Sequence, residues 1–211
     1  NQLTPHTFAV SDYYLYETRK QLNQLEKRSI GKAAASLVQT NDIIFISHGT
    51  TTSEFARALD PQMVLTVITD GLDIINIFQN HPNVRLYTTG GTMNYSSMQI
   101  EHNPYISCDI SHINLTKIFI GVGGFSFSRG VTFYDFNSFE FLRQIIPNNG
   151  ELIVLADSTK FESVALANFI NIDQISMLVT DWTIDPSYVK QMESIHLPYL
   201  IAPKPSDYSA E

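Results

Sequence analysis

The sequence has a single cysteine and no long apolar run, and both shortages exclude classes of protein. Cys108 has no partner for an internal disulfide and cannot form a Cys-x-x-Cys site. No apolar stretch approaches the roughly 20 residues that a membrane-spanning helix needs, and we see no signal peptide. We therefore expect a soluble cytoplasmic protein with no membrane partner.

Positive charge is also scarce. The sequence has 13 lysines and arginines against 21 acidic residues, which gives a formal net charge of -8. An acidic chain without a basic cluster is a poor nucleic-acid binder by itself, because contacts to phosphates supply most of that affinity.

Several signatures of catalysis and cofactor binding are missing. The sequence contains no G-x-x-x-x-G-K-[ST] phosphate loop and no G-x-S-x-G nucleophile turn. Residues 121–124 lack the third glycine of the G-x-G-x-x-G dinucleotide fingerprint. The six histidines show no spacing typical of metal ligands. We therefore expect no metal, no cofactor and no catalytic residue.

The remaining pattern is that of one α/β domain. The 211 residues, 44% of them hydrophobic, are enough for one substantial core. We expect an arm or linker over residues 1–11, a single domain over 12–203 and a polar tail over 204–211. Expected strands cover 43–46, 64–69, 84–88, 117–122, 152–156, 177–180 and 197–202. Expected helices cover 12–39, 53–59, 72–78, 137–146 and 185–193, with a further helical stretch within 94–113 and a loop or hairpin around 129–130. In the first helix, residues 26–28 are expected on the exposed face. Strands that alternate with helices predict a parallel or mixed sheet.

One stretch predicts an anion site. The apolar strand 43–46 runs through a turn over residues 47–52, with one glycine and three threonines, into a helix. Such a turn directs free backbone N–H groups at one point, and the helix dipole makes that point attractive to phosphate. The alternative is that the threonines only cap the helix.

Four turns follow predicted strands directly, over residues 47–52, 88–92, 121–125 and 157–160. Ligands of open α/β sheets bind beyond the carboxyl ends of the strands, where such turns converge. We expect glycine N–H groups, threonine hydroxyls and one lysine to hold a phosphate: Gly49, Thr50, Thr51, Thr52, Gly90, Gly91, Thr92, Gly123, Gly124 and Lys160. Asp70, Asp135 and Asp157 could accept hydrogen bonds from sugar hydroxyls. The alternative is that these are ordinary strand-end turns.

In this order, the motifs resemble the C-terminal sensor domain of DeoR-family transcriptional regulators, over residues 26–181. The matching segments are EK at 26–27, FISHGTTT at 45–52, VITDGL at 67–72, TGGT at 89–92, FIGVGG at 119–124, ADSTKF at 156–161 and VTD at 179–181. The resemblance implies an open, mostly parallel, Rossmann-like sheet with helices on both faces, shared with ribose-5-phosphate isomerase and CoA-transferase relatives.

The resemblance also implies a function. It implies that a repressor of carbohydrate metabolism uses this domain to bind a phosphorylated sugar effector. It implies that DNA is contacted only through a winged helix-turn-helix that would precede this fragment. The long first helix and the apolar excursion over 94–113 favour a homo-oligomer.

The chain departs from the family pattern at four polar positions. Ser47 and His48 stand where the family's FLDSGTTT has aspartate and serine. The asparagine of the family's TNS is Asp70 here, and the aspartate of GADG is Gly123. We therefore expect phosphate binding to be retained. The residues expected to read the sugar, or to decide whether one is accepted, are Ser47, His48, Asp70, Asp135 and Asp157.

The alternative on the same fold is a sugar-phosphate isomerase. That reaction needs a carboxylate base beside a C–H next to a carbonyl, and Asp135, Glu140 and Asp157 are the candidates. The loss of acidic groups at Ser47 and Gly123 argues against it. A CoA-binding relative is disfavoured, because the glycine turns contain no glutamate.

Overall fold

The computed structural model describes residues 15–103, 105–109, 112–134, 141–143, 145–146 and 150–206. Its centre is a seven-stranded sheet in the order β12-β11-β9-β6-β1-β2-β3, and every neighbouring pair is parallel. The strands are β1 (Ile43–Ile46), β2 (Leu65–Thr69), β3 (Val84–Thr88), β6 (Lys117–Gly121), β9 (Glu151–Leu155), β11 (Met177–Thr180) and β12 (Tyr199–Ile201). Their nearly continuous apolar runs suit strands that are covered on both faces.

The strand order creates a crevice at the centre of the sheet. The first strand in the chain, β1, lies between the second, β2, and the fourth, β6, so the connections leave β1 and β6 in opposite directions. Ligands of doubly wound sheets bind beyond the carboxyl ends of the strands at this reversal. The predicted fold class, an open and mostly parallel α/β sheet, is confirmed.

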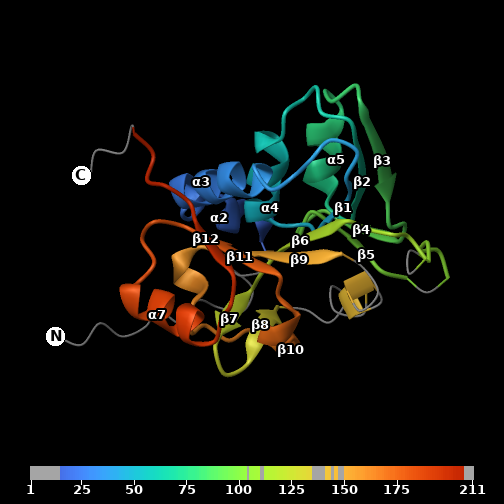
Figure 1. Cartoon of the computed structure of the whole chain (residues 1–211). Coiled ribbons are helices and arrows are strands. Elements are labelled where there is room, and N and C mark those ends of the chain that lie inside the picture. The colour runs from blue at the N-terminus through green and yellow to red at the C-terminus, as the bar shows by residue number, and fades with distance from the viewer. Residues whose placement is uncertain are drawn as a thin grey trace.

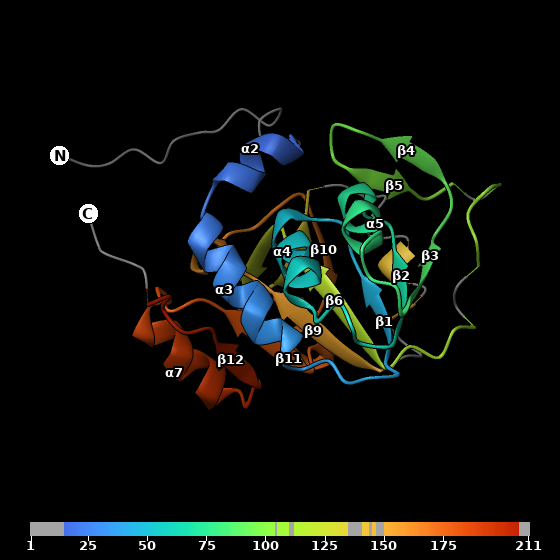
Figure 2. The ribbon, with the colours of Figure 1, turned by 90° about the horizontal axis from the view of Figure 1, so that it is seen from above.

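Three helices cover one face of the sheet: α3 (Gln24–Ala35), α4 (Thr50–Ala58) and α5 (Leu72–Phe78) (Figure 1). Their apolar sides pack on the sheet in one core cluster, in which Phe55 of α4 stacks on Phe119 of β6 with ring centroids 4.2 Å apart. The short helix α2 (Tyr16–Gln21) lies on the same side, between α3 and the hairpin of β4 (Thr92–Asn94) and β5 (Gln99–Glu101), as Figure 2 shows.

The other face carries α7 (Pro186–Ser194) and a small antiparallel sheet in the order β10-β8-β7. Its strands are β7 (Gly124–Ser126), β8 (Gly130–Phe133) and β10 (Ala167–Ile170). A second core cluster fills this side, with Phe125, Val131 and Met192 beneath the central strands. Two 3-10 turns, η2 (Ser158–Lys160) and η3 (Ile172–Gln174), complete the described elements.

Several expected boundaries differ from the structure. The single helix expected over 12–39 is broken at Leu22–Asn23, where Asn23 has a left-handed φ of 50°. Helix α4 begins at Thr50, so the three threonines form its first turn. The hairpin β4–β5 and strand β10 were not expected, and residues 105–109 form a turn instead of a helix. The helix expected over 137–146 lies mostly outside the described residues. No helix in the described ranges is long and apolar enough to cross a membrane.

Candidate functional site

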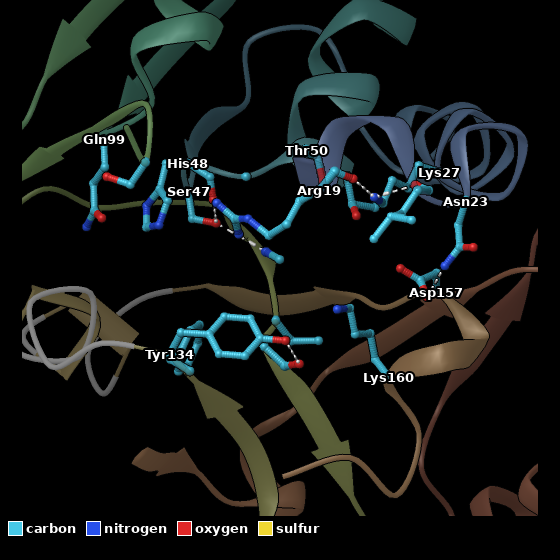
Figure 3. Close-up of a pocket in the computed structure, with 18 of the residues that line it drawn as sticks. Arg19, Asn23, Lys27, Ser47, His48, Thr50, Gln99, Tyr134, Asp157 and Lys160 are labelled. Carbon is cyan, nitrogen blue, oxygen red and sulfur yellow. Dashed lines mark hydrogen bonds between the residues drawn. The ribbon is translucent and has the colours of Figure 1, made fainter. Parts of the chain in front are cut away.

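A cavity of about 350 Å³ lies at the carboxyl ends of β1, β2, β6 and β9. Helix α2 and the start of α3 form one side of it, and the turns after β8 and β9 form the opposite side (Figure 3). The cavity therefore occupies the crevice that the strand order creates.

The N-terminus of α4 faces this cavity. Gly49 is the N-cap with a φ of 144°, and Gly49, Thr50 and Thr51 line the cavity. No side chain caps the helix in the part of the chain that the structure describes. Instead, the Thr52 and Ser53 hydroxyls donate to the Gly49 carbonyl, at 2.9 and 2.6 Å. The threonines therefore do not act as caps, and the first N–H groups of α4, which have no intrahelical acceptor, are left for a ligand.

The half-buried His48 and the buried Asp70 form a pair on the cavity wall. Asp70 Oδ1 accepts the backbone N–H of His48 at 2.6 Å, and Asp70 Oδ2 lies 2.8 Å from His48 Nδ1. The carboxylate places the ring proton on Nδ1, because a carboxylate only accepts hydrogen bonds. Asp70 thus orients His48 through both of its carboxylate oxygens.

The hydroxyl of Ser47 connects the end of β1 to the last residue of β6. Ser47 Oγ accepts the N–H of Gly121 at 3.1 Å and donates to the His48 carbonyl at 3.3 Å. Ser47 lines the cavity, but its hydroxyl already has these two partners.

The turn after β9 places Asp157 and Lys160 on the cavity wall. Asp157 Oδ1 accepts hydrogen bonds from the N–H and the hydroxyl of Thr159 and, at 3.2 Å, from Asn23 Nδ2. Lys160 Nζ lies 5.9 Å from the ring centroid of Tyr134, within the range of a cation–π contact. Burial lowers the pKa of Lys160, and the nearby Asp157 carboxylate opposes that shift. Figure 3 shows Lys160 directed into the cavity, opposite Arg19 and Lys27.

Arg19 and Lys27 are cavity residues that our sequence analysis missed. The prediction that Lys27 lies on the exposed face is wrong, because only 5% of it is exposed. The spacing could have revealed it, since Lys27, Ile30 and Ala34 follow one another at helical intervals on one buried face. Nothing in the pattern of α2 marks Arg19. Asn23, Gln99 and Tyr134 also line the cavity without having been predicted.

Three of the residues predicted to hold a phosphate lie away from the cavity. Gly90, Gly91 and Thr92 follow β3, the edge strand, and do not line the cavity. A side chain at Gly91 would collide with the Glu101 carbonyl, so close packing against β5 accounts for a glycine there.

Of the rest, Gly123 lines the cavity, whereas the buried Thr52 and Gly124 do not. Asp135 and Glu140 lie outside the described residues. Among the described residues, no group of His, Cys, Asp or Glu is arranged to hold a metal ion.

Comparison with known proteins places the chain among transcription regulators. It is 28% identical to the HTH-type transcriptional regulator IolR of Bacillus subtilis, over 83% of this chain and 69% of that protein. It is 29% identical to the regulator GolR of Listeria innocua, over 84% and 69% respectively. It is 27% identical to a putative aga operon transcriptional repressor of Escherichia coli O157:H7, over 78% and 61%.

The chain is also similar to solved structures at low sequence identity. The delta subunit of eIF2B from Chaetomium thermophilum is similar with a TM-score of 0.51 and 12% identity, over 75% of this chain and 56% of that one. Ribose 5 phosphate isomerase A from Neisseria gonorrhoeae gives a TM-score of 0.48 and 13% identity, over 69% and 55%.

The family model described as the DeoR C terminal sensor domain matches residues 22–182. These residues include six of the seven strands of the central sheet, and only β12 lies outside them. The chain therefore belongs to the DeoR family of transcriptional regulators and carries that family's C-terminal sensor domain.

Proposed function

We propose that this domain binds a phosphorylated sugar in the cavity and thereby controls DNA binding by the full-length repressor. The observation that carries the proposal is the uncapped N-terminus of α4, which faces a cavity that Arg19 and Lys160 also line. Helix N–H groups and convergent cations together suit a dianionic phosphate better than they suit a neutral ligand.

The remaining walls suit the carbon skeleton of a small polyol. His48, Gln99 and Asn23 supply polar groups, while Val122 and Phe133 supply apolar surface. A volume of about 350 Å³ lies at the lower end of the range typical of small-molecule sites. In this arrangement the phosphate binds at Gly49, Thr50 and Thr51, and His48 reads the sugar.

We propose that the domain acts as a sensor and not as an enzyme. Both carboxylate oxygens of Asp70 bind His48. Asp157 binds Asn23 and Thr159 through Oδ1, and its Oδ2 is buried and has no hydrogen-bond partner among the described residues. A carboxylate base for isomerisation needs an oxygen directed at the substrate. The names of the relatives also favour regulation over catalysis.

Control of DNA binding requires only modest coupling, since about 1–3 kcal/mol between two sites gives a clear response. We propose that residues 12–203 form the sensor, that residues 1–11 join it to a helix-turn-helix domain, and that the protein acts as a cytoplasmic homo-oligomer. Effector binding would change the arrangement of the subunits.

A thermal-shift screen tests this proposal. The protein is incubated with a panel of sugar phosphates and, as controls, the same sugars without phosphate. At least one phosphorylated compound should raise the melting temperature while its dephosphorylated counterpart does not, because only the former uses the α4 N-terminus. No shift from any phosphorylated compound would refute the sensor proposal. Aldose–ketose interconversion of the compound that binds would favour the isomerase.

A further inference from the structure

We propose that Lys27 is a positioning residue of this cavity: its ammonium group holds the C-terminal end of α2 and thereby sets where Arg19 enters. The expected effect on ligand affinity rests on the proposed function. The expected effect on α2 does not.

The contacts of Lys27 point to this role. Its Nζ donates to the carbonyl of Arg19 at 2.5 Å and to the carbonyl of Leu22 at 2.7 Å. The last carbonyls of a helix lack the usual N–H partner four residues on, and the Arg19 carbonyl has only a 3.3 Å hydrogen bond from the Leu22 N–H. The buried ammonium group of Lys27 therefore adds a charged donor at this helix end. Lys27 therefore completes the end of α2 from within α3.

Helix α2 depends on such contacts because it has only six residues, far fewer than a helix needs to be stable alone. At its other end, the backbone N–H of Tyr16 donates to the Ser96 carbonyl at 3.0 Å, and the Tyr16 hydroxyl donates to Asp73. Asn23 follows α2 and donates to Asp157 and Thr159. Helix α2 is thus held at one end by the turn between β4 and β5, and the residue after its other end is bound by the turn after β9.

Charged groups of α2, α4 and the turn after β9 act on Lys27. Burial is the largest influence and lowers the pKa of Lys27 to about 8. Asp157 and Glu54 favour the ammonium form, whereas Lys160 and Arg19 oppose it. A neutral amine keeps two N–H groups for the two carbonyls, so deprotonation removes the charge and leaves the tether.

Two roles of Lys27, holding α2 and contacting the ligand directly, predict different effects of removing its side chain. If Lys27 acts by placing Arg19, its removal should loosen α2 even when no ligand is present. Its removal should also have no further effect on affinity once Arg19 is gone, because two residues that act through one contact are not additive.

The first experiment uses the protein without ligand. Hydrogen exchange is compared between wild type, Lys27→Met and the matched control Lys32→Met, which removes an exposed lysine from the same helix. The amide of Leu22, which donates to the Arg19 carbonyl, should exchange about tenfold faster in Lys27→Met, because hydrogen bonds to a charged group are lost. It should be unchanged in Lys32→Met. Unaltered exchange over residues 16–22 in Lys27→Met would overturn the proposal.

The second experiment measures inorganic phosphate binding by thermal shift in wild type, Lys27→Met, Arg19→Met and the double variant. We expect Lys27→Met to weaken binding about tenfold in the wild-type background and to have no effect in Arg19→Met. An equal loss in both backgrounds would assign Lys27 to direct contact and overturn the positioning role. If wild type binds neither phosphate nor any sugar phosphate, the proposed function fails, and hydrogen exchange still decides whether Lys27 holds α2. Lys27→Gln, whose amide keeps one donor group, replaces Lys27→Met in both experiments if the latter does not fold.

Discussion

Asp70 binds His48 through both carboxylate oxygens, one on the backbone N–H and one on the ring. These residues occupy two of the positions at which the chain departs from the DeoR motifs, and the structure shows that the two departures are in contact. A histidine introduced after β1 is therefore accompanied by an acidic group after β2 that fixes its orientation.

Asp70→Asn should loosen His48 without abolishing phosphate binding. The amide keeps one acceptor but loses the charge, so we expect a loss of about 1–3 kcal/mol in the free energy of unfolding. Discrimination between sugar phosphates should fall, while the rise in melting temperature produced by inorganic phosphate should stay the same. Urea denaturation and thermal shift measure the two effects, with the exposed Asp173→Asn as control. Unchanged discrimination would remove His48 from sugar recognition.

Lys160→Ala should weaken binding of a phosphorylated sugar. The side chain enters the cavity next to Tyr134, and loss of a charge-assisted contact should reduce affinity by about tenfold or more. Stability should change little, because burial already disfavours the charged form of this lysine. Calorimetry on this variant and on the exposed control Lys190→Ala measures the difference. Equal affinities would place Lys160 outside the site.

Asp181→Asn should disturb the turn that carries Lys160. Asp181 is fully buried, and its two oxygens accept the N–H groups of Ser158 at 2.7 Å and Thr183 at 2.9 Å. An amide turns one of these acceptors into a donor that faces an N–H group, which should cost about 2–4 kcal/mol. Chemical denaturation measures the loss. A stability within error of wild type would mean that the turn is held by its other contacts.

Stability should rise with pH in the alkaline range because of Lys27. Its pKa is about 8 in the folded protein, whereas the ordinary pKa of lysine, 10.5, applies to the unfolded chain. Between these two pH values the unfolded chain therefore binds more protons than the folded protein does. The free energy of unfolding should therefore increase as pH rises from 8 toward 10.5, by up to about 3 kcal/mol. Other groups titrate in this range, so the quantity to compare is the difference between wild type and Lys27→Met in urea at pH 7.5 and pH 10. Parallel pH dependences in the two proteins would contradict this assignment.

Local sequence determined most of the fold. Continuous apolar runs specified the central strands to within one or two residues at each end, because a strand buried on both faces leaves that pattern. Asp185 and Pro186 marked the start of α7, where the Asp185 carboxylate accepts the N–H of Ser187 at 2.7 Å. The turn at Gly49 that leads into α4 was also evident, because a glycine before a helix has a local conformational cause. Weakly patterned segments, such as the β4–β5 hairpin, were not predicted.

Tertiary structure alone decided the composition of the site. Which strands are neighbours depends on long-range packing, so the sequence could not place β3 at the edge, with Gly90 and Gly91 outside the cavity. The break at Asn23 brings Arg19 and Lys27 to the cavity. The sequence pattern of α2 does not predict this break. The pairing of His48 with Asp70 joins residues from two strands, and only the parallel register of β1 and β2 brings their ends together. The sequence by itself thus determined the central strands and the turn at Gly49, whereas strand order and helix packing decided which side chains surround that turn.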